Sequence, residues 1–248
     1  MVVRSELDVI ASEQINKNYQ RVLERISAAA WEAGRDPKAV RLVVVTKGHS
    51  IETTRAVILA GARTLGENYV EEALPKMQAL TGESDLEWHM IGHVQSRKAR
   101  PVCEHFACVH SVDSLKLAER MDRFAAELGK SLTLLLECNV SREESKFGWK
   151  AWEEGEWSRL ADEIAPVLEL GHLNIRGLMT MPPFFADPEA TRPFFRRLHH
   201  LQSFLATRFP EAVWSELSMG MSADFEIAIQ EGATQVRVGT AILGERPR

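Results

Sequence analysis

Residues 41–48 read Arg41-Leu42-Val43-Val44-Val45-Thr46-Lys47-Gly48, an apolar run that ends in a threonine, a lysine and a glycine. The run is rich in β-branched residues, and apolar and polar positions do not alternate along it. A strand with one face in water alternates, whereas a parallel strand covered on both faces is apolar throughout. The segment therefore predicts a buried parallel strand over 41–45, with Lys47 just beyond its carboxyl end.

A strand followed by a helix recurs along the rest of the chain. Apolar residues at helical spacing from Ile15 to Ala30 predict a long leading helix that stops at Gly34. Further strands are predicted over 64–66, 86–91, 106–110, 132–136, 175–179, 213–217 and 235–238, and helices over 51–60, 70–80, 94–103, 114–128, 152–168, 190–208 and 223–230. This α/β alternation predicts a (β/α)8 TIM barrel, although a doubly wound open sheet gives a similar pattern and stays open as an alternative.

The composition fits one domain that acts on small molecules. A chain of 248 residues with 45% hydrophobic residues has the size of one barrel, and no linker divides it, so we expect a single domain over 1–248. The net charge of −5 gives no broad basic surface for nucleic acid, and no apolar run is long enough for a membrane span. Three cysteines without paired spacing indicate reduced thiols, so we expect a cytoplasmic protein.

Lys47 is the first candidate functional residue. The carboxyl ends of barrel strands form the face that carries the site, and polar groups follow most of the predicted strands. A lysine at the end of an apolar strand is partly desolvated, which lowers its pKa and frees the amine for Schiff-base formation. The alternative is a lysine that extends into solvent or pairs with a carboxylate such as Glu67.

The loops after the last two strands indicate a phosphate site. They read Ser218-Met219-Gly220-Met221-Ser222 and Gly239-Thr240, and barrels often bind phosphate in these two loops. Glycines allow backbone N–H groups to approach an anion, and hydroxyl groups donate further hydrogen bonds. Ser222 could equally be a helix N-cap. Arg237, two residues before Gly239, shares a face with it and could reach a ligand or form a salt bridge at the rim.

Several motifs, in order along nearly the whole chain, carry a resemblance to a known family. They are Val44–Lys47, Gly66–Glu72, Trp88–Gly92, His110–Asp113, Asn139–Ser141 with Glu143–Gly148, Gly177–Met179, Leu217–Ser222 and Val236–Gly244. Together they resemble the pyridoxal 5′-phosphate (PLP) homeostasis proteins, which are single-barrel relatives of the alanine racemase N-terminal domain.

The resemblance implies that the cofactor is PLP, held on Lys47 as an internal aldimine. The implied cofactor-binding residues further include Ser218, Met219, Gly239 and Thr240 around the phosphate, Arg237 at the pyridine nitrogen, and Asn68, His89 and Met179 along the ring. An arginine keeps its proton, so the ring nitrogen stays largely unprotonated and the ring is a weak electron sink. Such a site favours holding the cofactor over demanding carbanion chemistry.

One segment departs from the family pattern. Gly92–Lys98 carries Val94 where leucine is usual and Arg97 where asparagine is usual. The basic residues Arg97, Lys98 and Arg100 are expected to form a solvated helix face.

The sequence favours a carrier of PLP over an enzyme. A racemase needs a second base, which the alanine racemase relatives take from a C-terminal domain, whereas this chain ends at Arg248, and neither Tyr19 nor Tyr69 is well placed. We therefore expect a monomer that stores PLP or delivers it to PLP-dependent apo-enzymes, without catalytic residues. An amino-acid racemase stays open as the alternative, and a sugar-phosphate barrel enzyme without PLP remains only if Lys47 carries no cofactor.

Overall fold

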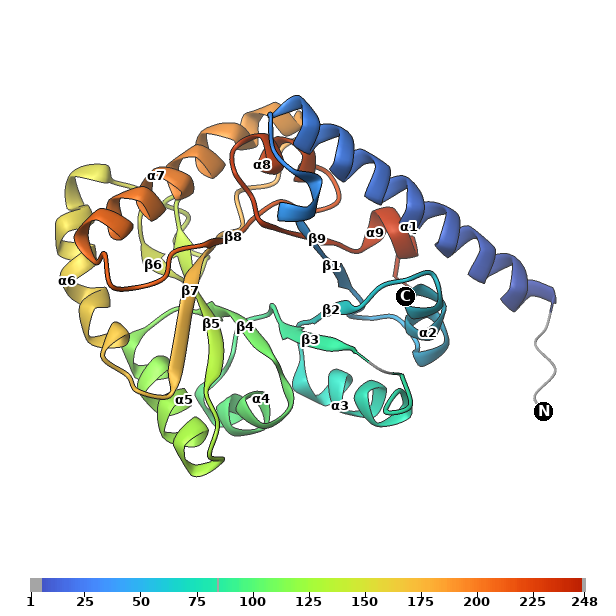
Figure 1. The fold of residues 1–248 in the computed structure, drawn as a ribbon, viewed down its shortest axis with the longest axis horizontal. Coiled ribbons are helices and arrows are strands. Elements are labelled where there is room, and N and C mark those ends of the chain that lie inside the picture. Colours follow the sequence, from blue (N-terminus) through green and yellow to red (C-terminus); the bar gives the residue numbers. More distant parts are fainter. Residues whose placement is uncertain (1–5, 84, 247–248) are drawn as a thin grey trace.

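A computed structural model describes residues 6–83 and 85–246 of the chain, with side chains from Ser12 onward. Eight parallel strands form the centre of the fold: β1 (Arg41–Val45), β2 (Thr64–Glu67), β3 (Glu87–Met90), β4 (Cys108–Val112), β5 (Leu132–Asn139), β7 (Leu173–Met179), β8 (Glu216–Ser218) and β9 (Gln235–Val238). They lie in the order β4-β3-β2-β1-β9-β8-β7-β5, and β4 also pairs with β5 (Figure 1). This last pairing closes the ring, so the predicted barrel is confirmed and the open sheet is excluded.

Helices surround the barrel (Figure 1). The α-helices are α1 (Glu6–Glu32), α2 (Ile51–Leu59), α3 (Val70–Ala79), α4 (Ala99–His105), α5 (Leu115–Glu127), α6 (Trp157–Leu168), α7 (Arg192–Arg208), α8 (Phe225–Gln230) and α9 (Thr240–Leu243). Short 3-10 helices are η1 (Pro37–Ala39), η2 (Ser96–Lys98), η3 (Glu154–Glu156) and η4 (Pro188–Thr191). No described helix is long and apolar enough to span a membrane.

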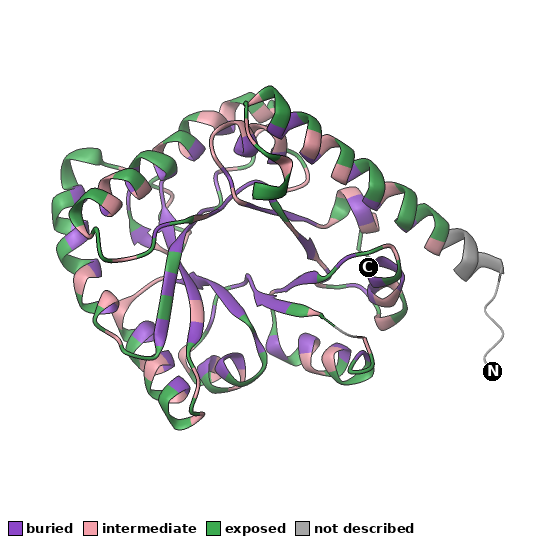
Figure 2. Ribbon diagram, in the orientation of Figure 1, coloured by how far each residue is buried: buried purple, intermediate pink, exposed green. Residues whose placement is uncertain are grey.

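Helix α5 shows why these segments become helices. Ser114 caps its start by accepting a hydrogen bond from the Leu117 N–H, and the chain turns away after it at Gly129, whose φ of +65° suits glycine. Leu117, Met121 and Ala125 recur at helical spacing and are buried. Figure 2 shows the same division elsewhere, with buried strands and helices whose outer faces are exposed.

The predicted leading helix is present as α1. It packs against α2, α8 and α9, which lie beside β1 and β9 (Figure 1). Its residues Tyr19, Val22 and Ile26 are buried in this contact. The helix therefore covers the region where the first and last strands meet.

The inside of the barrel is partly polar. Most buried apolar residues form one cluster between strands and helices, and Val43, Ile91, Cys108, Leu135 and Met179 are buried apart from it. The ring also encloses His89, His110, Ser218 and Arg237, each at most 3% exposed. The strands thus enclose charged and hydrogen-bonding groups that no amphipathic pattern reveals.

Several boundaries differ from the predicted ones. The predicted strand over 106–110 begins at Cys108, because the Phe106 N–H caps α4 by donating to the Val102 carbonyl. The predicted helix over 94–103 begins at Ala99, which places Pro101 in the first turn, where a proline costs no hydrogen bond. A short extra strand, β6 (Trp149–Lys150), pairs with the end of β5 and was not predicted.

Candidate functional site

Lys47 lies half-buried in the turn that follows β1. The pKa of its amine is lowered, mainly because burial disfavours the charged form and further because Arg246 and Arg237 are close; Glu67 and Glu72 partly oppose this. Within the described part of the chain, its amine has no hydrogen-bond or ion-pair partner. A free amine with a lowered pKa is the form of lysine that attacks a carbonyl carbon.

Glu67 does not neutralise Lys47. Its Oε1 accepts hydrogen bonds from Lys76 Nζ and from Thr46 Oγ1, each at 2.7 Å. Lys76 Nζ also donates to the Thr46 carbonyl at 2.7 Å, so this network lies next to Lys47 in the chain. The alternative in which Lys47 pairs with Glu67 is therefore wrong, because Lys76 occupies that position.

Arg237 brings a buried positive charge to the same end of the barrel. Its guanidinium donates to Ser218 Oγ at 2.6 Å and to the Thr180 carbonyl at 2.9 Å. Burial lowers the pKa of Arg237 to about 10, so the group stays charged at neutral pH. Two hydrogen bonds that fix the planar fork leave further N–H groups for a ligand.

Ser222 joins the two predicted phosphate loops. Its Oγ accepts hydrogen bonds from the Gly239 N–H at 3.3 Å and the Ala241 N–H at 3.2 Å. Gly239 lies against β1, because a Cβ built on it would lie 3.1 Å from the Val45 carbonyl oxygen. Thr240, the next residue, is exposed and begins α9. The loops after β8 and β9 thus meet beside the strand that leads to Lys47.

Three other predicted cofactor-binding residues differ in whether they face the proposed site. Asn68 follows β2, and its Oδ1 is buried without a hydrogen-bond partner among the described residues. Met179 is buried inside the ring, level with its strand neighbour Ser218. Met219 packs into the cluster outside the barrel, and its N–H donates to the Gln235 carbonyl. The placement therefore supports site positions for Asn68 and Met179, and gives no support to one for the Met219 side chain or N–H.

His89 is placed deeper than the prediction assumed. It is 1% exposed, and its Nδ1 lies 2.9 Å from His110 Nε2, while His110 Nδ1 lies 2.8 Å from Ser218 Oγ. His110 and Ser218 therefore separate His89 from Arg237. A direct contact of His89 with the cofactor ring stays a prediction, and the structure shows only this indirect connection.

Glu137 is a titratable group that the sequence prediction missed. It lies in β5 and is 5% exposed. Burial and the nearby Asp113 raise its pKa to about 7, although Arg237 opposes the shift. Its position at the start of the pattern Glu137-Cys138-Asn139 at a strand end was the available signal.

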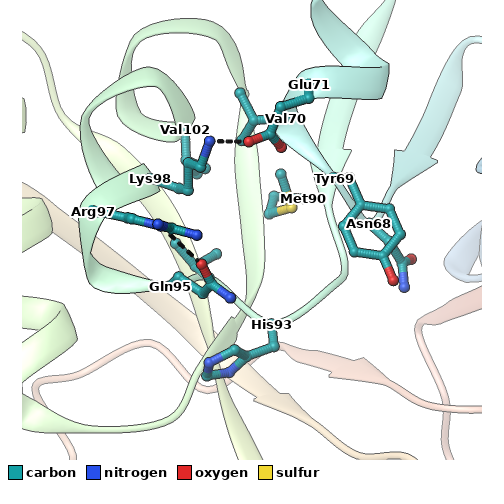
Figure 3. A pocket seen from close by; sticks show the side chains of 11 residues that line it. Asn68, Tyr69, Val70, Glu71, Met90, His93, Gln95, Arg97, Lys98 and Val102 are labelled. Carbon is teal, nitrogen blue, oxygen red and sulfur yellow. Dashed lines mark hydrogen bonds and ion pairs between the residues drawn. The ribbon is translucent and has the colours of Figure 1, made fainter.

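The segment that departs from the family pattern borders a separate hollow of about 250 Å³ (Figure 3). Asn68 is the one predicted cofactor residue among those that line it, and Lys47 is not among them. Lys98 pairs with Glu71, and Arg97 Nε donates to Gln95 Oε1 at 3.1 Å (Figure 3). These contacts agree with the expected solvated helix face.

Comparisons with known proteins agree over nearly the whole chain. The family model described as "Alanine racemase, N-terminal domain" matches residues 10–247. A pyridoxal phosphate homeostasis protein of Pseudomonas aeruginosa is 42% identical over 237 residues, which cover 94% of this chain and 96% of that protein. A protein of the same name from Aquifex aeolicus is 40% identical over 230 residues, which cover 93% and 97% of the two chains.

Solved structures give the same result. PipY of Synechococcus elongatus, in a structure with PLP bound, is 38% identical with a TM-score of 0.78 and covers 90% of this chain and 100% of its own. An alanine racemase of Clostridium difficile, only 15% identical with a TM-score of 0.66, shares the fold and is covered over 58% of its length. The chain carries an alanine racemase N-terminal domain and belongs to the pyridoxal phosphate homeostasis protein family.

Proposed function

We propose that this protein binds PLP through Lys47 and acts in PLP homeostasis. The observation that carries the proposal is a half-buried amine with a lowered pKa and no partner in the described chain, close to the buried Arg237 guanidinium. PLP supplies an aldehyde that condenses with a primary amine, and it carries a phosphate dianion. A free amine suits the aldehyde, and a fixed donor such as the Arg237 guanidinium suits the ring nitrogen, which accepts a hydrogen bond.

The donor set fits the cofactor. Lys47 would take the aldehyde, and the loops joined by Ser222, with Gly239, Thr240 and Ser218, would hold the phosphate. Arg237 would face the ring nitrogen, and the unpartnered Oδ1 of Asn68 offers a further polar contact. PipY, a relative whose structure has PLP bound, supports this assignment.

The carrier reading is favoured over a racemase. Tyr69 is 63% exposed, and Tyr19 belongs to α1 and is buried in the contact of that helix with α2, α8 and α9, so neither tyrosine is positioned as a second base at Lys47. The relatives are named homeostasis proteins, which supports a role without catalysis. We further propose a cytoplasmic monomer that stores PLP or hands it to apo-enzymes.

Absorbance spectroscopy tests the proposal directly. Purified protein mixed with PLP should develop the visible band of lysine-bound PLP, and Lys47→Ala should not. Lys38→Ala, which changes an exposed lysine, is the matched control and should bind like the wild type. Absence of the band in the wild type would refute PLP binding, and appreciable racemisation of L-alanine would refute the carrier role.

A further inference from the structure

A chain of polar contacts crosses the barrel interior from one mouth to the other. Arg237 Nη1 donates to Ser218 Oγ at 2.6 Å, and Ser218 Oγ lies 2.8 Å from His110 Nδ1. His110 Nε2 lies 2.9 Å from His89 Nδ1, and His89 Nε2 lies 3.7 Å from Glu87 Oε2. The chain thus links the proposed PLP site to a carboxylate at the opposite mouth.

Glu87 is open to solvent at that opposite mouth. It is the first residue of β3, and it lines a hollow of about 210 Å³ together with His89. Arg41, Arg176 and Glu216 are among the other residues that line this hollow. Water in the hollow can therefore exchange protons with His89, whereas His110 is fully buried.

The chemistry of the groups restricts the hydrogen positions. Arg237 can only donate, so Ser218 Oγ accepts from it and has one hydrogen left to donate. Burial is the main cause that lowers the pKa of both histidines. The pKa of His89 is further lowered by Arg41 and raised by Glu87 and Glu216. The pKa of His110 is further lowered by Arg237 and Arg41. Each ring is therefore neutral and carries a single N–H.

Two arrangements satisfy these restrictions. In the downward arrangement, Ser218 donates to His110 Nδ1, His110 Nε2–H donates to His89 Nδ1, and His89 Nε2–H points to Glu87. In the upward arrangement, His89 Nδ1–H donates to His110 Nε2, and His110 Nδ1–H donates to Ser218. The Ser218 hydroxyl hydrogen is then free for a ligand above it.

The groups at the two ends of this series of hydrogen bonds, Glu87 and a bound phosphate, favour opposite arrangements. The Glu87 carboxylate accepts hydrogen bonds and favours the downward arrangement, because the upward one turns the His89 Nε2 lone pair toward it. A phosphate dianion above Ser218 also only accepts, and it favours the upward arrangement. A phosphate bound at Ser218 and the Glu87 carboxylate at the opposite mouth therefore favour opposite tautomers of the two imidazole rings.

We propose that His110 and His89 form a relay that reverses when a phosphate monoester binds at Ser218, and that Glu87 weakens phosphate binding by opposing this reversal. The inference rests on the proposed function, since it requires the PLP phosphate at Ser218. The reversal conserves protons: one proton passes along the chain and leaves from His89 Nε2 into the hollow, and Ser218 takes one from the phosphate monoanion or from water. Glu87, His89 and His110 are thus positioning residues for Ser218.

Nitrogen-15 NMR of labelled histidines reads the relay directly, because it distinguishes Nδ1–H from Nε2–H rings. Without ligand, His89 and His110 should both be Nε2–H; with saturating PLP, both should become Nδ1–H. Pyridoxal, which can react with Lys47 but lacks the phosphate, is the matched ligand and should leave both rings unchanged. Unchanged rings under PLP would overturn the relay while the visible band of bound PLP leaves the proposed function intact; no band at all would overturn both.

Glu87→Gln tests the opposite mouth. The glutamine amide can donate to His89 Nε2, so this variant should bind PLP about threefold more tightly and pyridoxal with unchanged affinity. Glu127→Gln, which removes a surface carboxylate paired with Arg100, should change neither affinity. An equal or weaker PLP affinity of Glu87→Gln would overturn the relay.

Metal analysis provides an independent check. Ligand atoms of His89, Cys108 and His110 lie within 4.8 Å of one another. A metal ion between the two rings would replace their hydrogen bond. One equivalent of zinc in the purified protein would therefore overturn the relay, and metal-free protein is the expected result.

Discussion

The Lys76 ammonium lies 2.7 Å from Glu67 Oε1, with 4% of the lysine side chain and none of the glutamate side chain exposed. Both groups also bond to Thr46, the residue before Lys47. Burial raises the pKa of Glu67, and the hydrogen bonds from Lys76 and Thr46 lower it. The ion pair therefore holds the strand end that carries the reactive amine and keeps a negative charge from standing alone in the interior.

Lys76→Met should destabilise the protein strongly. The substitution leaves the Glu67 carboxylate buried without its cation, which costs about 3–5 kcal/mol of unfolding free energy. Urea denaturation measures this loss. Lys98→Met, which breaks the surface pair with Glu71, is the control and should cost no more than about 1 kcal/mol. Equal losses for the two variants would show that the buried pair contributes no more than a surface one.

The sequence predicted the barrel and the place of Lys47, because buried parallel strands have a distinct apolar pattern. It could not predict Lys76 as a buried residue, since a lysine within a charged helical stretch has the pattern of a solvent-facing position. The contact of His110 with Ser218 spans 108 positions of the chain and exists only because the ring closes. The outward side chain of Met219, in contrast, follows from strand alternation with Ser218 and was available from the sequence.

Arg246→Ala should raise the pKa of Lys47. Arg246 is the first of the two arginines whose charge lowers this pKa, and its side chain lies against Gly48. Removing it reduces the fraction of neutral amine at pH 7, so PLP should bind more slowly. The pH at which the binding rate reaches half of its maximum should rise. Stopped-flow absorbance across pH measures both. Arg208→Ala, on the outer helix α7, should leave the profile unchanged, and the same profile for Arg246→Ala would contradict the assigned cause.

Ser222→Ala should weaken PLP binding more than it weakens the fold. The hydroxyl oxygen accepts from two backbone N–H groups and joins the loops after β8 and β9. Losing it should cost about 1 kcal/mol of stability and, because the loops no longer hold each other, about tenfold in PLP affinity. Fluorescence titration with PLP and thermal unfolding measure the two effects. Ser203→Ala, on an exposed part of α7, is the control with unchanged affinity. A stability loss without an affinity loss would place Ser222 outside the phosphate site.

Glu137 should make the protein less stable as pH rises toward 7 and beyond. Its pKa is raised from 4.5 to about 7 in the folded protein, so between these values the folded state binds a proton that the unfolded state has released. This contribution is fully present below the unfolded pKa and is lost as pH rises through the folded one. Glu137→Gln, which is neutral at every pH, should therefore match the wild type near pH 4.5 and exceed it by about 3 kcal/mol at pH 8. Urea denaturation at both pH values measures the difference, with the exposed Glu144→Gln as control. A constant difference between Glu137→Gln and the wild type across pH would mean that Glu137 is ionised throughout, held so by Arg237.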